Sequence, residues 1–302
     1  LAVANGTKPK AVLGMNCLSV RKRAELLSLL CEGCSIATIT RHTGAHKMTI
    51  LALLKDAGAV CASYLDRELR GLRIRRVQAD EIWSFVYMKE KRVPAPFKGF
   101  PGLGDAWLWL AICTDSKLII SHHVGCRGEK SATAFVKDLA SRLVDRIQLS
   151  TDGHRPYITA VEAAFYSDSV DYAMIAKHAI VSESDGSEVF GYPVFGEPDP
   201  YHINTSYIER YNLTVRMTDR RFTRKTNGFS KSIANHKHSI ALHIFYYNFV
   251  RVHMALGRTP AMAAKLARNP WYYEDIIELI DKKKRDAVKP GFVTPIVRRR
   301  SV

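Results

Sequence analysis

The sequence of 302 residues has no long apolar run. Its apolar stretches, such as Ala106–Cys113, are far shorter than the roughly 20 residues that span a bilayer. The first residues also lack the charged and apolar segments of a secretory signal. We therefore expect a cytoplasmic protein with no membrane partner.

Cysteine pairs with the spacing of metal ligands are scarce. Six cysteines are spread over the chain, and only Cys31 and Cys34 are spaced as zinc ligands are. No second pair completes a four-ligand site, and most cysteines lie in apolar segments. We expect buried, reduced thiols rather than zinc, as in a cytosolic protein.

Acidic residues are outnumbered. The chain has 29 Asp and Glu against 45 Lys and Arg, a net charge of +16. An excess of this size indicates a polyanionic partner, and nucleic acid is the first candidate. Hydrophobic residues make up 47% of the chain, so a sizeable core can form, and the length is typical of two domains.

The first part of the chain shows three successive helical patterns over residues 18–60, after a flexible lead over 1–17. A leucine-rich helix is followed by a short helix with Ser35 as its N-cap, and a third helix over Lys47–Lys55 stops at Gly58. This order is typical of a helix-turn-helix. The alternative is a small helical packing domain. In the DNA-binding interpretation the third helix reads DNA with His46, Lys47 and Thr49.

After a charged linker over 61–75 the periodicity changes to alternation, which predicts strands. We predict five of them, with helices over Glu129–Leu143 and His154–Phe165 and a long loop over Ser182–Pro200. The predicted strands are Val77–Tyr87, Ala106–Cys113, Leu118–Val124, Ile147–Leu149 and Tyr172–Ile175. The order predicts an α/β fold: a ribonuclease-H-like mixed sheet over 76–265, behind an all-α helix-turn-helix domain. A basic helix and tail over 266–302 complete the chain.

Three acids stand out by position. Asp80 lies inside the first predicted strand, Asp152 at the end of the fourth, and Glu209 on a later helix. The sheet can bring such positions together, and clustered carboxylates are what hard divalent cations prefer as ligands. Strand parity places Asp80 and Glu81 on opposite faces, so we expect that they cannot both enter one site.

The helix predicted within Tyr201–Lys225 carries Glu209 in a basic setting. Arg216 and Arg220 follow it by seven and eleven positions, which places all three within roughly 20° of one helix face. A carboxylate beside arginines suits a cation next to a phosphate backbone. Arg224 lies in the same stretch.

Two of these assignments have simpler alternatives. Asp152 precedes a glycine and could be only a turn residue. His154 could position a phosphate or a water, or it could be a surface histidine at the start of a helix.

Several segments together resemble a known family. They are Gln78–Phe85, Ser150–Tyr157, Asn204–Arg216 and Tyr247–Pro260. In combination they are similar to DDE transposases of bacterial insertion sequences, in particular the insertion-sequence-one type. The zinc ribbon that precedes the helix-turn-helix in many relatives is missing here.

The resemblance implies specific roles. Asp80, Asp152 and Glu209 would be the catalytic, metal-binding triad, holding two Mg²⁺ ions for which Mn²⁺ can substitute. DNA contacts would come from Arg216, with Arg220 and Arg224 nearby. The expected activity is cleavage of the 3′ ends of a mobile element and strand transfer into target DNA. The partners would be double-stranded DNA, namely terminal inverted repeats and target DNA, and further copies of the chain, in association with the nucleoid.

Two other functions fit the same residues. One is a metal-dependent DNA endonuclease without strand transfer. The other is a catalytically inert helix-turn-helix regulator that only binds DNA.

Overall fold

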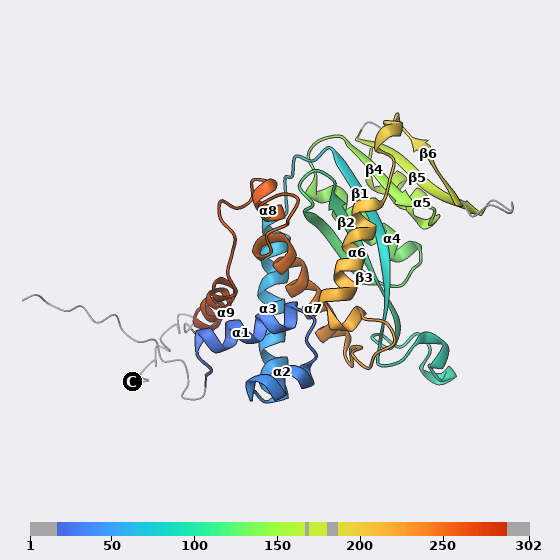
Figure 1. Ribbon diagram of the computed structural model, residues 1–302. Coiled ribbons are helices and arrows are strands. Elements are labelled where there is room, and N and C mark those ends of the chain that lie inside the picture. The colour runs from blue at the N-terminus through green and yellow to red at the C-terminus, as the bar shows by residue number, and fades with distance from the viewer. Residues whose placement is uncertain (1–16, 167–168, 180–186, 289–302) are drawn as a thin grey trace, which may run out of the picture.

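The computed structural model describes residues 17–166, 169–179 and 187–288, which form a helical layer beside a sheet with helices on both of its faces (Figure 1). Almost all of the predicted lead over 1–17 lies outside the described residues, as does the arginine run at 298–300. The described part begins at Cys17 and ends at Val288.

One sheet of six strands forms the centre of the fold, in the order β3-β2-β1-β4-β5-β6. Their bounds are Arg76–Val86 (β1), Gly104–Cys113 (β2), Ile119–Gly125 (β3), Ile147–Asp152 (β4), Val170–Ala179 (β5) and Ser187–Phe195 (β6). β1, β2 and β3 pair antiparallel, β4 and β5 continue parallel to β1, and β6 returns antiparallel. This mixed sheet confirms the predicted ribonuclease-H-like α/β fold.

The sixth strand is where the prediction of a loop over Ser182–Pro200 was wrong. β6 is an edge strand, so its Gly191 and Pro193 do not interrupt the interior of the sheet. A Cβ atom at Gly191 would come within 2.4 Å of Cγ2 of Ile203, so the glycine allows the segment that leads to the next helix to pack against β6. Turn-rich composition therefore concealed a strand.

Helices cover both faces of the sheet. α4 (Glu129–Arg142) and α5 (Pro156–Ala164) cover one face, where the fully buried rings of Trp109, Phe135 and Tyr157 pack together. α6 (Ser206–Thr218) covers the other face. Oε1 of Gln78 in β1 accepts hydrogen bonds from the first-turn amides of Tyr207 and Ile208, which anchors the start of α6 on the sheet.

The helical layer consists of α1 (Val20–Cys31), α2 (Ile36–Thr43), α3 (Lys47–Glu68), α7 (Ile233–Phe245) and α9 (Tyr273–Val288). The residues at the two ends of α2 have the capping roles that their types favour. Ser35 caps α2 through the amide of Thr38, and Gly44 ends it with a left-handed backbone. Cys31 and Cys61 are buried in this layer, as predicted, whereas Cys17 and Cys126 are exposed.

The predicted end of the third helix at Gly58 was wrong. α3 continues to Glu68, so the linker predicted over 61–75 is helical for half of its length. Gly58 is a contact residue instead of a stop: a Cβ atom there would lie 2.4 Å from Cβ of His238 in α7. The glycine permits close packing of the two helices, a role that the sequence alone does not distinguish from helix termination.

The C-terminal helix α9 also belongs to this layer. Arg23 of α1 forms a buried, bidentate ion pair with Asp281, with N–O distances of 2.6 and 2.7 Å. The basic run from Lys282 to Arg285 lies on its exposed side. Among the described helices, α3 alone is long and apolar enough to cross a bilayer, a test that the core helix of a folded domain also passes, and α3 packs against α7 and α9.

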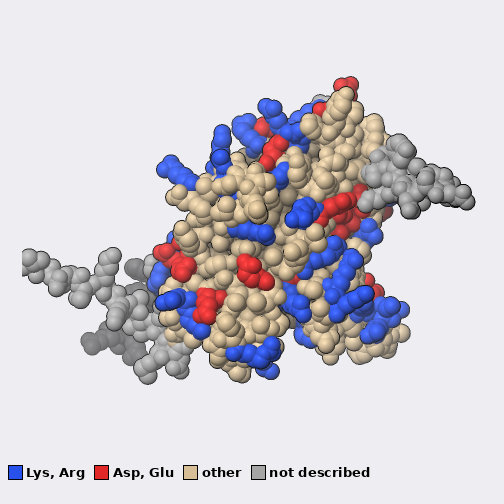
Figure 2. Space-filling model, in the orientation of Figure 1, with Lys and Arg blue, Asp and Glu red and all other residues tan. Residues whose placement is uncertain are grey.

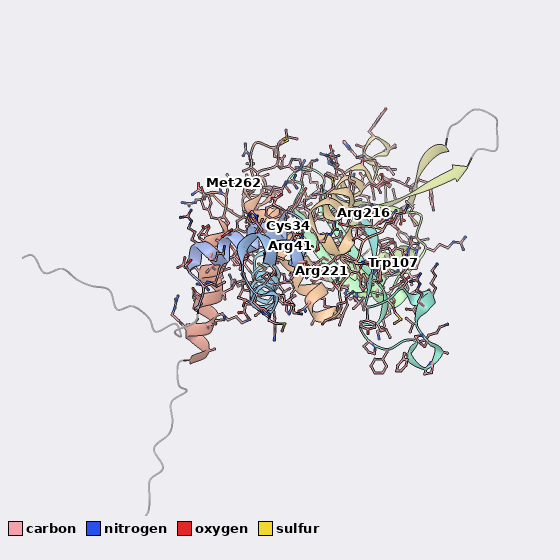
Figure 3. All side chains as sticks on the ribbon, turned by 60° about the horizontal axis from the view of Figure 1, so that its bottom comes forward. Cys34, Arg41, Trp107, Arg216, Arg221 and Met262 are labelled. Carbon is pink, nitrogen blue, oxygen red and sulfur yellow. The ribbon has the colours of Figure 1, made fainter. Side chains whose placement is uncertain are left out.

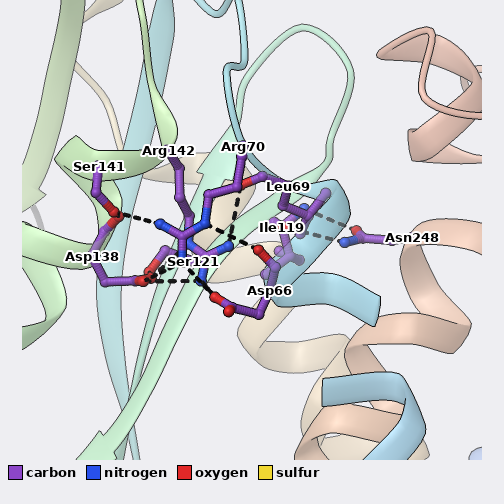
Figure 4. A network of polar contacts seen from close by, with 9 residues as sticks. All are labelled: Asp66, Leu69, Arg70, Ile119, Ser121, Asp138, Ser141, Arg142 and Asn248. Atoms are coloured by element: carbon purple, nitrogen blue, oxygen red, sulfur yellow. Dashed lines mark hydrogen bonds and ion pairs between the residues drawn. The ribbon is translucent and has the colours of Figure 1, made fainter. Parts of the chain in front are cut away.

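A polar joint holds the helical layer to the sheet domain (Figure 4). Arg142 of α4 binds Asp138, the side chain of Asp66 in α3 and the carbonyl of Leu69. At a second contact between the two parts, the Asn248 side chain donates a hydrogen bond to the carbonyl of Ile119 and accepts one from its amide. The end of α3 and the segment after α7 are therefore fixed against the sheet by directional contacts.

Candidate functional site

Three carboxylates meet where β4 ends beside β1. Asp80, Glu81 and Asp152 each offer one oxygen atom, and these atoms lie within 4.8 Å of one another. Asp80 comes from the middle of β1, and Asp152 is the last residue of β4. The parallel pairing of Ala79 with Thr151 sets the two strands in this register, so the structure brings the two predicted aspartates together.

Glu81 in this cluster corrects the expectation that neighbouring acids of a strand cannot share a site. Parity governs the direction in which each Cβ leaves the strand. β4 ends at Asp152, however, while β1 continues to Val86, so from Glu81 onward this edge of β1 has no β4 residue beside it. The longer Glu81 side chain reaches the Asp152 oxygens around that edge.

Arg127, from the segment between β3 and α4, connects these acids. Its Nε lies 3.2 Å from Oε2 of Glu81, and its Nη2 lies 3.8 Å from Oδ2 of Asp152. His154 fixes the arginine backbone, because its Nε2 lies 2.9 Å from the carbonyl oxygen of Arg127. The backbone amide of His154 also donates to Oδ1 of Asp152. His154 thus orients the cluster from the start of α5.

The electrostatic state of the cluster favours a positive ion. Burial and then the charge of Asp152 raise the pKa of Asp80 to about 7. The same two causes, together with the charge of Asp80, raise the pKa of Glu81 to about 8. Two neighbouring carboxyl groups with raised pKa values are costly to ionise together. A bound cation would compensate their charge and stabilise the ionised forms.

Unpaired buried oxygens show that the residues present fit such an ion. Oε1 of Glu81 and Oδ1 of Asn212 are buried and lack a partner in hydrogen-bonding geometry, although the buried Tyr157 hydroxyl interacts with the Glu81 carboxyl. Asn212 is 4% exposed and donates a 2.7 Å hydrogen bond from its Nδ2 to Oδ2 of Asp80. Carboxylate and amide oxygens form the donor set that Mg²⁺, Mn²⁺ and Ca²⁺ take, while soft metals prefer sulfur.

Glu209 lies one helical turn before Asn212 on α6, outside the group of oxygens within 4.8 Å. Its Oε1 accepts a 3.1 Å hydrogen bond from Thr205, and its charge contributes to the raised pKa of Asp80. The structure therefore places Glu209 beside the cluster, where it is exposed to solvent. Its role as the third ligand stays a prediction.

Arginines follow Glu209 in the sequence, but they do not all lie on one face of α6. Arg216 is half-buried on α6, and its pKa is lowered by burial and by the charge of Arg224, while Asp80 opposes that shift. Arg216 is thus close enough to both Asp80 and Arg224 to be affected by their charges. The prediction that Arg220 shares the helix face was wrong, because α6 ends at Thr218 and Arg220 begins a separate short turn.

The region after α6 lies between the two parts of the fold. In Figure 3, Arg221 and Arg216 lie between the helical layer, marked by Cys34 and Arg41, and the sheet, marked by Trp107. Arg220 and Arg221 line a cavity shared with Cys34 and Lys47. Figure 2 shows Lys and Arg side chains gathered below α6, over the segment that follows it and the 88–103 segment.

The predicted recognition residues lie at the start of α3. His46 caps this helix by accepting from the amide of Met48, and Lys47 and Thr49 follow in the first turn. All three residues are exposed. Their contact with DNA stays a prediction.

Sequence reasoning missed Arg127 and Asn212. Arg127 follows a strand with no motif to mark it. Asn212 had a signal, because it lies three positions after Glu209 and therefore on a neighbouring part of the same helix surface.

No family model and no curated protein matches the chain. Among solved structures, a chain of the simian T-cell lymphotropic virus intasome in complex with PP2A regulatory subunit B56 gamma is 15% identical, with a TM-score of 0.38 over 83% of this chain and 77% of that chain. A chain of the piggyBac transposase synaptic complex with hairpin DNA is 10% identical, with a TM-score of 0.40 over 91% and 73%. A chain of the Mos1 transposase paired-end complex with left transposon end is 12% identical, with a TM-score of 0.24 over 80% of each chain. Identities and TM-scores this low do not assign the chain to a family.

Proposed function

We propose that this protein is a DNA transposase that cleaves the 3′ ends of a mobile element and joins them to target DNA. The observation that carries the proposal is the cluster of Asp80, Glu81 and Asp152, with unpaired buried oxygens, in a chain of net charge +16. A dense group of carboxylates repels phosphate unless cations compensate it. A cluster of this kind on a strongly basic protein fits metal-dependent phosphodiester chemistry.

Mg²⁺ or Mn²⁺ would be held by Asp80, Asp152 and Glu81, with Glu209 next to them. When bound, such ions polarise the phosphate and lower the pKa of the attacking hydroxyl or water. The DDE assignment of Asp80, Asp152 and Glu209 is part of this proposal, and Glu81 is an addition to it from the geometry.

The protein's own groups would prepare the site for that chemistry. The Asn212 amide fixes one oxygen of Asp80, and Arg127 holds Glu81 near Asp152. Arg216 and Arg224 would bind phosphates of the DNA strand beside the cluster. In-line attack needs the nucleophile and the phosphate held in fixed positions, and these contacts would supply that positioning.

The remaining parts would select the DNA. The exposed start of α3, with His46, Lys47 and Thr49, would read the terminal inverted repeats in the major groove. Each chain has one such acidic cluster among its described residues, and two element ends must be joined. We therefore propose that copies of the chain assemble on DNA, at the nucleoid in the cytoplasm.

The test is a strand-joining assay. Labelled, pre-cut duplexes from the two borders of the DNA that flanks the gene are incubated with the purified chain, a supercoiled plasmid and Mg²⁺. Labelled plasmid is the expected product. Asp80→Asn should abolish joining and leave binding of the duplexes unchanged, because it removes a charge from the cluster without changing the exposed start of α3.

Asp115→Asn is the matched control, since Asp115 is an exposed acid in the turn between β2 and β3 that pairs with Arg76. It should join DNA as the wild type does. Cleavage without joined product would instead establish an endonuclease, and binding without either would establish a regulator. Joining by Asp80→Asn would overturn the assignment of the site.

A further inference from the structure

A row of half-buried aromatic rings lies on β1 beyond the acids. Trp83, Phe85 and Phe229 form this aromatic platform. The ring centroids of Trp83 and Phe85 are 5.5 Å apart at 36°, and those of Phe85 and Phe229 are 4.8 Å apart at 32°. Phe229 is held beside the end of β1, because Val86 bridges to Ser230 and the amide of Tyr87 donates to the Ser230 carbonyl. The three rings therefore form a continuous row of ring contacts.

The aromatic platform continues from Glu81 of the acidic cluster along one face of β1. Trp83 and Phe85 follow Glu81 at steps of two residues along β1, so their side chains share its face. Trp83 pairs across the strands with Trp107, and the guanidinium of Arg127 lies 4.7 Å from the centre of the Trp107 ring. Arg127 thus contacts the acids and also Trp107, the cross-strand neighbour of Trp83. At about 3.4 Å per residue, Trp83 lies roughly 7 Å along the strand from Glu81.

The surroundings of the aromatic platform are strongly basic. Trp83, Phe85 and Phe229 line a cavity of about 480 Å³ whose described lining includes five cationic residues and no Asp or Glu: Lys89, Arg92, Arg221, Arg224 and Lys225. Nζ of Lys89 lies 5.5 Å from the centre of the Trp83 ring. Nζ of Lys231 lies 2.9 Å from the centre of the Phe229 ring. An occupant of this cavity must therefore combine a flat apolar face with negative charge.

We propose that the aromatic platform binds an unpaired nucleobase of the DNA strand whose phosphate lies at the acidic cluster. This inference rests on the proposed function and adds a second binding site to it. A base in a duplex is covered on both faces by its neighbours, so only an unpaired base can stack on these rings. Lys89, Arg224 and Lys225 would pair with the flanking phosphates.

The test compares two labelled DNA duplexes that carry the same unpaired tail, one with normal bases and one with abasic nucleotides. The phosphates are identical, so the difference in affinity reports base stacking alone. Binding is measured by fluorescence anisotropy with the full chain in EDTA. The wild type should bind the tail with bases at least about fivefold more tightly, since a stacked base typically contributes 1–3 kcal/mol.

Trp83→Ala and Phe85→Ala should lose this preference and keep the affinity for the abasic tail. Phe85→Tyr keeps a ring and should keep the preference. Phe100→Ala is the control, because Phe100 is an exposed ring of the 88–103 segment outside the aromatic platform. Lys89→Gln should weaken both tails equally.

Two results would overturn the inference: equal affinity of the wild type for the two tails, or an equal loss for both tails in Trp83→Ala and Phe85→Ala when circular dichroism shows both variants folded. The assay needs no metal and no catalysis. A protein that shows the preference but joins no DNA would leave the aromatic platform established and refute the transposase proposal.

Discussion

Asn212 of α6 donates a 2.7 Å hydrogen bond to Oδ2 of Asp80 in β1, and its own Oδ1 is buried without a partner. This single contact ties the helix that carries Glu209 to the strand that carries the first aspartate. It fixes the orientation of the Asp80 carboxylate, which lies at the centre of the proposed chemistry.

We predict that Asn212→Ala lowers the rate of strand joining by about 10- to 100-fold, the range typical of residues that orient metal ligands. The loss of orientation should affect activity far more than folding, so circular dichroism should show a native helix content. Leu213→Ala, at an exposed neighbouring position of α6, is the control and should act as the wild type does. An unchanged joining rate in Asn212→Ala would remove Asn212 from the site.

Divalent metal should stabilise the fold through the acidic cluster. Adding Mn²⁺ to the metal-free protein should raise its Tm, and EDTA should reverse the rise, because an ion bound only by the folded state stabilises it by about 2.7 kcal/mol at a hundredfold excess over Kd. Glu81→Gln should shrink this rise, since Glu81 supplies a buried oxygen to the cluster. Differential scanning fluorimetry measures both effects.

The control for that experiment is Glu129→Gln, an exposed acid in the first turn of α4. It should show the Mn²⁺ response of the wild type. If Glu81→Gln also responds as the wild type does, Glu81 takes no part in holding the ion.

Acid should destabilise the helical layer through two buried histidines. Burial lowers the pKa of His236 and of His243 to about 4. The unfolded chain binds these protons with a pKa of about 6.5, so the stabilisation is complete above that pH and is lost as the pH falls toward 4. Each histidine should cost up to about 3 kcal/mol of unfolding free energy over this range.

Urea unfolding at a series of pH values between these limits measures the effect. His243→Gln should flatten the dependence on pH, because glutamine does not titrate. His42→Gln, at an exposed position of α2, should leave the dependence unchanged. A steep dependence that survives replacement of both His236 and His243 would place its origin elsewhere.

The ion pair between Arg23 and Asp281 should hold α9 to α1. Both side chains are less than a tenth exposed, so Arg23→Ala would leave a buried carboxylate without its partner. We predict a loss of roughly 3 kcal/mol in the free energy of unfolding. The double replacement Arg23→Met with Asp281→Leu should recover most of it, because no unpaired charge remains. Urea unfolding of the two variants at neutral pH distinguishes these outcomes.

The sequence was sufficient for five of the six strands and for two of the three acids. Local pattern predicts these strands and places Asp80 inside one and Asp152 at the end of another, and the structure brings both residues together. The sequence was insufficient where packing between elements determines the bounds of a helix. Gly58 is read locally as a helix stop, and only the contact with His238 shows why the helix continues.

Glu81 illustrates a second limit. Strand parity is a rule about Cβ directions, while the reach of a glutamate around an open strand edge depends on where the neighbouring strand ends. β4 stops at Asp152, and a pattern of residues within β1 holds no information about that. The same applies to Arg127, which enters the site from a segment with no motif.

α3 is one unbroken helix from the exposed residues at its start to the joint with α4 at its end. Its 22 residues span about 33 Å, close to the roughly 34 Å of one turn of B-DNA. Because α3 is continuous and its end is bonded to α4, we propose that the end that would read the repeat and the acids that would cut the strand keep a constant rotational phase around the duplex. Moving the cleavage point by half a turn relative to the repeat would carry the scissile bond to the opposite side of the DNA axis, whereas a whole turn would return it to the same side.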